Sequence, residues 1–515
     1  MTLRQSMAWI HGWLGLLAGW ILFAMFLTGT ASYFRPEITQ WMQPEYRAAP
    51  VSSAQAAETA VAHMQRVGTY DVQWYVYLPD ARTTAMRIFE QRKPDPNAAK
   101  KRRRAPEIVL DPATGNEVHA RETRGGEHFY RFHFQLQLPP IWGRWVAGLC
   151  AMFMLGAIIS GVITHKRIFA DFFTLRWNKG QRSWLDAHNV SAVLALPYHA
   201  MITYTGLITL VAMYMPWPVA ANYAKPADYY VAAFGTPADR EASETPAPLV
   251  PIGPLVADAE RRFAAPVSTL VVRHPNDRDS TVTLYRRTTA SLNGRGPSIT
   301  YSGSDGRLLE KAGDVGPALA TAGVMLGLHV AQFAGPALRW AYLLLGLTGA
   351  AMVGTGLLLW TAKRRKPGAM PFFGLKLVER LNIGVIAGLP IGMAAYLLAN
   401  RLIPAAATGR AEAEVAAMFW AWGGIALLQL ARPARRAWSE GFAVGAAAFA
   451  AIPLVDIVTT SRGLPGSLLS GDMLFAGFDL AMLAIAALLA LGAWRSGRSK
   501  PAAKVRRTIR EKEYA

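Results

Sequence analysis

Six histidines carry the chemistry that this sequence most strongly indicates. They lie within or at the ends of the first four long apolar stretches, whereas the last four apolar stretches contain no histidine. Ionisable side chains are costly inside a bilayer and are usually functional there, and imidazole is a common ligand of transition metals. We therefore expect metal binding inside a membrane protein. The six candidates are His11, His133, His165, His188, His199 and His329.

The spacing of these histidines favours two metal centres rather than one. His188 and His199 are eleven residues apart, which is about 16 Å along a helix. The expected topology puts His11 and His188 near one face of the membrane, and His133 and His329 near the other. Two axial imidazoles per iron is an arrangement that holds b-type haem. The chain has no Cys-x-x-Cys-His segment, so covalent haem attachment is not expected. We predict two stacked haem b groups.

An internal repeat predicts which histidines pair. His11 and His188 are each followed by a Thr-Gly pair whose glycine comes eighteen positions later. His133 and His329 are each followed by an Arg-Trp pair and then by a glycine. Repeats in membrane proteins are related by pseudo-symmetry, so equivalent side chains are expected to face each other. The repeat therefore pairs His11 with His188, and His133 with His329.

Two further histidines leave the pairing open. His165 aligns with Trp360 and His199 aligns with Leu22, so neither has a counterpart in the other copy. Either one is a rival ligand, and His199 with His329 is the main alternative for the second pair. If they do not bind a metal, the histidines are expected to act as interfacial anchors or interhelical hydrogen-bond donors.

Other repeated residues suit a haem site. Arg144 and Arg339 occupy equivalent positions near the outer ends of their helices, where a guanidinium suits a haem propionate or a lipid head group. Glycines such as Gly12, Gly15, Gly19 and Gly29 either let a flat macrocycle approach the first helix or allow close helix packing. The sequence does not indicate a catalytic residue.

The composition supports a polytopic membrane protein. Of 515 residues, 52% are hydrophobic and 17% are charged, whereas soluble domains carry about 25% charged residues. The net charge of +20 comes from basic residues that cluster beside apolar stretches, as the positive-inside rule predicts, so no nucleic-acid partner is expected. The single cysteine, Cys150, excludes an intrachain disulfide and a cysteine-based metal site. The first apolar stretch lacks a cleavage site and is expected to be retained.

We expect eight spans with both termini in the cytoplasm. The fold class is mainly α, with two small α+β units inserted between spans 1 and 2 and between spans 3 and 4. The basic run 100–104 lies on the predicted outer side, in a loop too long for the charge rule to apply. The predicted divisions are span 1 (1–34), outer segment 1 (35–140), span 2 (141–165), a cytoplasmic loop (166–184), span 3 (185–215), outer segment 2 (216–318), span 4 (319–361), a cytoplasmic loop (362–380), a four-helix region (381–494) and a basic tail (495–515).

The two outer segments show the same order of patterns. Each begins with a helical stretch, 53–67 in the first and 252–263 in the second. Runs of alternating polarity follow, and each segment ends in a hairpin-like strand and glycine turn. The expected strands are 72–78, 84–89 and 108–115 in the first segment, and 268–273, 280–286 and 299–306 in the second.

Several motifs resemble the PepSY-associated transmembrane proteins. They are HGWLGLLAG from His11, LTG ending at Gly29, LDPATG ending at Gly115, GVITHKRIF from Gly161, SWLDAHN from Ser183 and YTG ending at Gly206. The likeness covers residues 1–366. This family is often called iron-regulated membrane proteins, and some members are ferric-siderophore reductases with haem in the bacterial inner membrane. The resemblance implies periplasmic PepSY-like domains and a role in iron acquisition. The four helices after residue 381 go beyond the family's minimal pattern.

The leading hypothesis is therefore an inner-membrane oxidoreductase that reduces a periplasmic ferric siderophore or similar ferric chelate. No Gly-x-Gly-x-x-Gly follows a strand, so no NAD or flavin site is expected, and electrons must come from quinol or a separate reductase. One alternative is a regulatory PepSY module that binds a partner without redox chemistry. Another is a transporter component for siderophore or iron, for which Asp456 and Asp479 in the last spans are the only hints.

Overall fold

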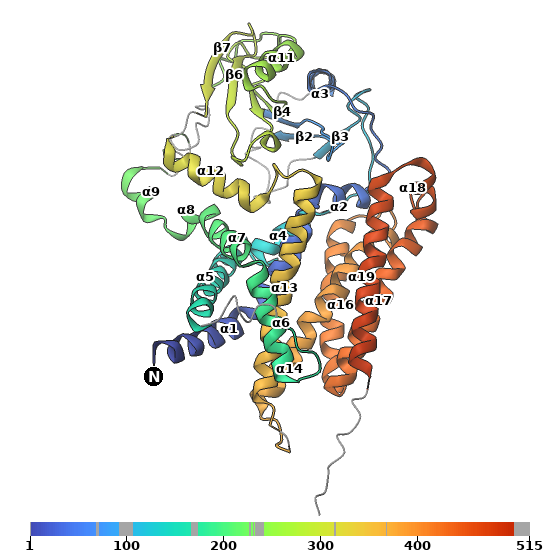
Figure 1. Ribbon diagram of the computed structural model, residues 1–515. Helices are drawn as coiled ribbons and strands as arrows, with labels where there is room; N and C mark the ends of the chain where they lie inside the picture. The colour runs from blue at the N-terminus through green and yellow to red at the C-terminus, as the bar shows by residue number, and fades with distance from the viewer. Residues whose placement is uncertain are drawn as a thin grey trace, which may run out of the picture.

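The computed structural model describes residues 2–67, 72–91, 107–165, 174–225, 228–229, 231, 241–313, 316–366 and 368–498. The predicted basic run 100–104, part of the first cytoplasmic loop (166–173) and the tail from residue 499 lie outside these residues. The helices form a membrane region, and one sheet domain stands at one end of it (Figure 1). We refer to that end as the sheet side and to the opposite end as the far side.

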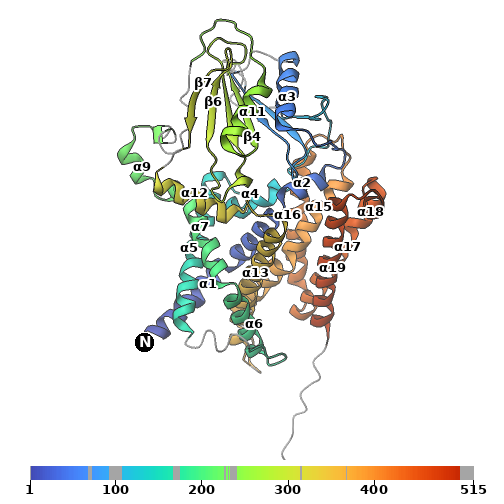
Figure 2. The same ribbon diagram turned by 45° about the horizontal axis from the view of Figure 1, so that its top comes forward.

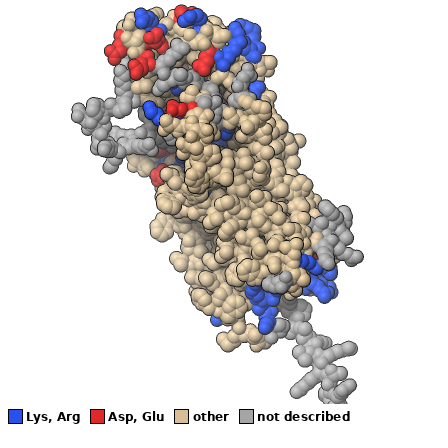
Figure 3. Space-filling view, turned by 90° about the vertical axis from the view of Figure 1, so that its left-hand side faces the viewer, with Lys and Arg blue, Asp and Glu red and all other residues tan. Residues whose placement is uncertain are grey.

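The predicted polytopic fold is confirmed. Among the described residues, seven helices are long and apolar enough to cross a membrane, and a bent pair of helices raises the number to eight. Figure 3 shows charged side chains gathered at the two ends of one face, with an uncharged region between them. The spans are α1 (Leu3–Ser32), α5 (Pro140–Thr164), α13 (Pro336–Arg364), α14 with α15 (Phe373–Ile386, Gly388–Leu402), α16 (Arg410–Leu428), α17 (Ala434–Thr459), α19 (Met473–Gly497) and the bent pair α6 (Gln181–Leu194) with α7 (Leu196–Thr209).

Two predicted spans are interrupted. The third is bent by 68° between α6 and α7. Pro197 lies in the first turn of α7 and has no N–H to continue the ladder of α6. The separation of about 16 Å expected for a straight helix therefore does not describe His188 and His199.

The fourth predicted span consists of two helices, α12 (Pro317–Val330) and α13. Ala331 ends α12 in the left-handed conformation with φ 53°, and Pro336 begins α13. The first copy of the repeat has the same arrangement, in which the short helix α4 (Glu127–Gln135) precedes α5. Each copy therefore places a short helix on the sheet side before its second span. Another short helix, α2 (Arg35–Met42), follows α1.

The two outer segments form one sheet rather than two separate ones. Its seven strands run in the order β3-β2-β1-β4-β5-β6-β7, and the two segments meet where Tyr75 of β1 pairs with Val271 of β4. All the described pairings are antiparallel. The strands are β1 (Gln73–Tyr77), β2 (Met86–Gln91), β3 (Glu107–Leu110), β4 (Val267–Arg273), β5 (Thr281–Arg286), β6 (Ser298–Ser302) and β7 (Leu308–Ala312).

Helices α3 (Ser53–Val67) and α11 (Ile252–Phe263) pack together against this sheet (Figure 2). Both coincide with the helical stretches expected from the sequence. Glu58 on α3 accepts a hydrogen bond of 2.6 Å from the backbone N–H of Gly253 at the start of α11. One hydrophobic core contains residues from both segments, so the segments stabilise each other.

The last helices form a bundle beside the repeat region, which we call the C-terminal bundle (α14 to α19; orange to red in Figure 1). It contacts α1, α2 and α13. The remaining short elements are α8 (Val211–Tyr214), α9 (Trp217–Asn222), α18 (Leu464–Ser470) and the 3-10 turns η1 (Thr288–Ala290) and η2 (Gln429–Ala431).

Candidate metal centres: two facing histidine pairs

The far-side pair joins the first and second copies of the repeat. His11 on α1 and His188 on α6 face each other with ring centroids 6.0 Å apart and ring planes at 66°. These are the partners that the repeat predicted. A whole repeat separates these two histidines along the chain, so only helix packing brings them together.

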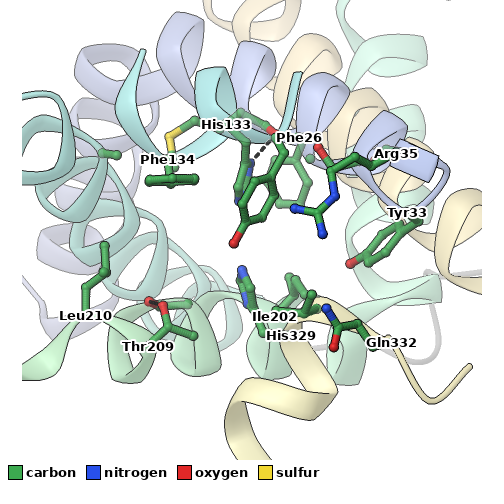
Figure 4. A pocket seen from close by; sticks show the side chains of 18 of the residues that line it. Phe26, Tyr33, Arg35, His133, Phe134, Ile202, Thr209, Leu210, His329 and Gln332 are labelled. Atoms are coloured by element: carbon green, nitrogen blue, oxygen red, sulfur yellow. Dashed lines mark hydrogen bonds between the residues drawn. The ribbon is translucent and has the colours of Figure 1, made fainter. Parts of the chain in front are cut away.

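The sheet-side pair is built from the two short helices. His133 on α4 and His329 on α12 have ring centroids 6.0 Å apart and ring planes at 36°. Figure 4 shows the two rings on opposite walls of a cavity. The interruption of the predicted fourth span therefore has a structural role, because α12 is turned so that His329 meets His133.

Each of these four rings is oriented by a hydrogen bond at Nδ1. His11, His188 and His133 bond to backbone carbonyl groups, which accept only from a protonated Nδ1. That tautomer leaves the lone pair of Nε2 for a metal ion, as in many metalloproteins. The three acceptors are Ala157 O for His11 (2.8 Å), Met352 O for His188 (2.8 Å) and Met25 O for His133 (2.7 Å).

His329 follows the same rule with one difference. Its Nδ1 lies 3.1 Å from Oγ1 of Thr205, which itself donates to Met201 O and therefore accepts from the imidazole. The backbone carbonyl of Ile202 is a second acceptor for this ring. All four rings are thus held through Nδ1 by a neighbouring helix.

A glycine makes room for each ring. It lies four residues after the carbonyl that bonds the imidazole, so the ring rests on the helix where a side chain would otherwise project. An added Cβ would approach the imidazole of His133 to 2.6 Å and that of His329 to 2.8 Å. The ring and glycine pairs are His11 with Gly161, His188 with Gly356, His133 with Gly29 and His329 with Gly206.

A serine or threonine precedes each of these glycines. Its hydroxyl bonds to the carbonyl four residues earlier in its own helix, so it does not occupy the space of the ring. The four residues are Thr28 (2.7 Å to Ala24 O), Ser160 (2.6 Å to Gly156 O), Thr205 (2.7 Å to Met201 O) and Thr355 (2.6 Å to Ala351 O).

The ring separation suits two imidazoles on opposite sides of one metal ion. Metal–imidazole bonds of about 2 Å on either side put the ring centroids about 6 Å apart. Among the described residues, no group of three His, Cys, Asp or Glu is placed to hold a metal ion. Each pair could supply two imidazole nitrogens to one metal ion.

A cavity of about 290 Å³ surrounds the sheet-side pair. Its walls include the aromatic side chains of Phe26, Tyr130 and Phe134, and it extends from the membrane helices to the base of the sheet domain. Binding sites for small molecules have this combination of an apolar, aromatic wall and a few polar groups.

Three arginines are among the described residues that line the cavity, and no motif in the sequence indicated them. Each is paired with a carboxylate: Arg35 with Glu127 (3.1 Å), Arg82 with Glu37 (2.8 Å) and Arg287 with Asp80 (2.6 Å). Arg82 and Arg287 come from the sheet domain, at positions that the repeat pattern of the two outer segments did not single out. Their position at the cavity follows only from how that domain docks.

The two arginines that the repeat did indicate take different roles. Arg339 is bonded to Glu37 (2.8 Å) and to the carbonyl of Ala334. Arg144 lies over the ring of Phe134, a cavity residue, at 5.5 Å. Neither arginine is itself among the residues that line the cavity.

The two rival histidines lie apart from the pairs. His199 is fully buried, with Nε2 3.3 Å from Oγ1 of Thr348, and it packs edge-on against Phe26 at 6.0 Å. His165 caps the end of α5, and its Nε2 is 3.1 Å from Nδ2 of Asn189. In this structure His133, rather than His199, faces His329.

Three glycines of α1 differ in their surroundings. Gly12 and Gly15 face open space, whereas an added Cβ on Gly19 would lie 2.8 Å from the side chain of Leu357. Gly19 is thus a helix-packing position.

Comparison with known proteins identifies one family whose model matches this chain. The family model described as PepSY-associated TM region matches residues 8–363. The match includes all four paired histidines and both segments of the sheet, and it ends before the C-terminal bundle. No curated protein matches the chain.

Proposed function

The chain belongs to the family of PepSY-associated transmembrane proteins, and from that premise we propose that it is a di-haem b electron-transfer protein. In this proposal it is an oxidoreductase of iron acquisition, and it passes electrons across the bacterial inner membrane to a ferric siderophore or similar ferric chelate. The observation that carries the proposal is that two pairs of histidines face each other, one pair on each side of the membrane region. In each pair the ring centroids are 6.0 Å apart.

The residues at both sites fit haem b. His11 and His188 would hold one group through their imidazoles, and His133 and His329 would hold the other. A haem held in this way supplies reversible one-electron transfer.

The protein's own side chains have three tasks in this scheme. The carbonyl groups at Nδ1 fix the ligand tautomer, and the glycines allow the rings to reach their positions. The aromatic wall of the sheet-side cavity limits water. The arginines at its rim offer charge-assisted hydrogen bonds to carboxylates, either of a cofactor or of an anionic chelate.

The sheet-side cavity is also the favoured place of reduction. It reaches the base of the sheet domain, so a chelate docked between that domain and the membrane would lie close to His133 and His329. Oxygen donors hold Fe(III) tightly, and its reduction to Fe(II) loosens the chelate.

The charge pattern supports an orientation with the sheet domain in the periplasm. Lys363 and Arg364 lie in the last turn of α13 at its far-side end, and Arg365 and Lys366 follow it, where the positive-inside rule places the cytoplasm. Both termini are then cytoplasmic, and lipid surrounds the spans. Electrons enter from quinol or a separate reductase near the far-side pair.

A reduced-minus-oxidised absorption spectrum of the detergent-purified protein, with pyridine haemochrome quantitation, tests the proposal. We expect a b-type spectrum and about two haems per chain. His188→Ala and His329→Ala should each remove one haem. His199→Leu, which installs the residue found at the equivalent position of the first copy, should retain both.

Other results would contradict the proposal in distinguishable ways. Protein without haem, after expression with adequate haem supply, would favour the regulatory PepSY module. Loss of a haem in His199→Leu, with both haems retained in His133→Ala, would make His199 the partner of His329. Both haems present without reduction of any ferric chelate would remove the proposed substrate class.

A further inference from the structure

The C-terminal bundle contains a cluster of fully buried charged residues near the sheet side. The cluster consists of Arg401 on α15, Asp456 on α17 and Asp479 on α19, and each of these residues is at most 5% exposed. Trp41 of α2, which belongs to the repeat region, packs against the cluster and is also fully buried. The haem proposal uses none of these residues. Charged side chains within membrane spans are costly and usually functional.

The guanidinium of Arg401 donates a hydrogen bond to only one of the two aspartates, although both attract it electrostatically. Its Nε donates to Asp456, its Nη1 donates to Asn400 Oδ1 (2.7 Å) and its Nη2 donates to the backbone carbonyl of Trp41. It also stacks on the ring of Trp41 at 3.7 Å. Asp456 is therefore the charge partner of Arg401.

Asp479 has no cation of its own among the described residues. Its Oδ1 accepts a hydrogen bond of 3.3 Å from Nε1 of Trp41, and the backbone N–H of Leu464 also donates to this carboxyl group. Its Oδ2 has no hydrogen-bond partner in the described part of the chain, and the same holds for Oδ2 of Asp456. The two carboxyl groups are close enough to interact electrostatically.

In a neighbouring buried carboxylate, that of Glu414, both oxygens have partners. Glu414 is also fully buried, yet Oε1 accepts from Asn400 (2.8 Å) and pairs with Arg410 (3.1 Å), while Oε2 accepts from Thr123 (2.5 Å). Burial alone therefore does not leave carboxylate oxygens without partners in this bundle.

We propose that Asp479 holds a proton at neutral pH and donates it in a hydrogen bond to Asp456. A proton on Oδ2 of Asp479, donated in a hydrogen bond to Oδ2 of Asp456, provides partners for both orphaned oxygens. With this proton, the two carboxyl groups and the one guanidinium have no net charge. The cost of an unpaired buried charge is thereby removed. The proton is taken up from, and returned to, water on the sheet side.

Helix α2 links this site to the cavity of the sheet-side pair. Trp41 is near one end of α2, and Glu37 near the other end bonds both Arg82 and Arg339. When the proton leaves, two carboxylates compete for Arg401, which holds Trp41 by stacking and by a hydrogen bond. Proton release is therefore expected to shift α2 and the arginines at the cavity.

Infrared spectroscopy of the purified full-length protein tests the site. The wild type should show the C=O stretching band of a protonated carboxylic acid at neutral pH, shifted in heavy water. Asp479→Asn should abolish this band, and Asp479→Glu should move it. The matched control is Asp472→Asn, at the start of the same helix, where the carboxylate is paired with Arg462 at 2.7 Å; it should leave the band unchanged.

The band in the wild type and its loss in Asp479→Asn would support the site. Absence of the band from folded wild type, or its persistence in Asp479→Asn, would overturn it. This readout does not depend on haem, so it separates the proton site from the proposed function. The link through α2 does rest on that function: chelate reduction should depend on outer pH in the wild type and lose that dependence in Asp479→Asn, and an unchanged dependence would overturn the link.

Discussion

At each of the four paired histidines, a hydroxyl residue, a glycine and a backbone carbonyl on a neighbouring helix act together. The carbonyl fixes the ring, and the glycine four residues later provides its space. The sequence displayed these glycines as a repeat, and for Gly29 it offered two explanations, macrocycle approach or helix packing. The structure adds a third role, because these glycines accommodate the imidazole rings.

Gly29→Ala should weaken the sheet-side centre. The new Cβ would lie 2.6 Å from Nδ1 of His133, so the ring must move away from Met25 O. Overpacking of this kind costs about 1–3 kcal/mol, which is roughly a fivefold to hundredfold loss of cofactor affinity. The measurement is the haem content of the purified variant. Gly423→Ala is the control, since an added Cβ there meets nothing within 4 Å. Equal haem content in both variants would contradict this account.

At the scale of elements, the short helix α12 connects the sheet domain with the sheet-side pair. The loop between β5 and β6 packs against it, and the N–H of Gly294 bonds to the carbonyl of Gly323 at 2.9 Å. Gly327, two residues before His329, lies directly under the carbonyl of Leu292. The position of His329 thus depends on a domain outside the membrane.

Gly327→Ala is expected to separate α12 from this loop. The added Cβ would lie 1.6 Å from the oxygen of Leu292, a backbone atom that cannot turn away. We expect loss of most of the sheet-side haem and faster proteolysis between β5 and β6, with the far-side haem retained. Gly335→Ala, just after α12 with nothing within 4 Å, should behave as the wild type. Retention of both haems in Gly327→Ala would show that the loop does not position His329.

At the scale of the whole molecule, the two sheet segments form a single cooperative unit. Val76 of β1 and Leu270 of β4 are both fully buried in the same core, although about two hundred residues separate them. Val76→Ala and Leu270→Ala should therefore lower the midpoint temperature of the same thermal unfolding transition. Leu270→Ala should lower the free energy of unfolding by about 2–5 kcal/mol. Tyr77→Ala, at a position 46% exposed, should have a small effect. Two separate transitions for the two core variants would contradict a shared core.

Membrane orientation is a second property of the whole molecule. In a background with Cys150→Ser, a cysteine placed at Asp305, in the turn between β6 and β7, should react with a membrane-impermeant maleimide added to intact spheroplasts. A cysteine at Lys179, before α6 on the far side, should react only after the membrane is opened. The basic residues beside α13 predict this result through the positive-inside rule. The opposite labelling pattern would invert the proposed direction of electron flow.

The sequence by itself indicated the membrane class, most of the spans, the two helices and six of the seven strands of the sheet domain, and the favoured histidine partners. These depend on local periodicity and on an internal repeat, both of which are written in the order of residues. The repeat favoured His11 with His188, and His133 with His329, but left His165 and His199 as rivals.

Only the tertiary structure decided the remaining features. The pairing of Tyr75 with Val271 merges two segments into one sheet, and the docking of that sheet brings Arg82 and Arg287 to the cavity. The orphaned oxygens of Asp456 and Asp479 likewise appear only when α17 and α19 pack side by side. Such contacts join residues far apart in the chain, and their free energy depends on which surfaces meet, which local patterns do not encode.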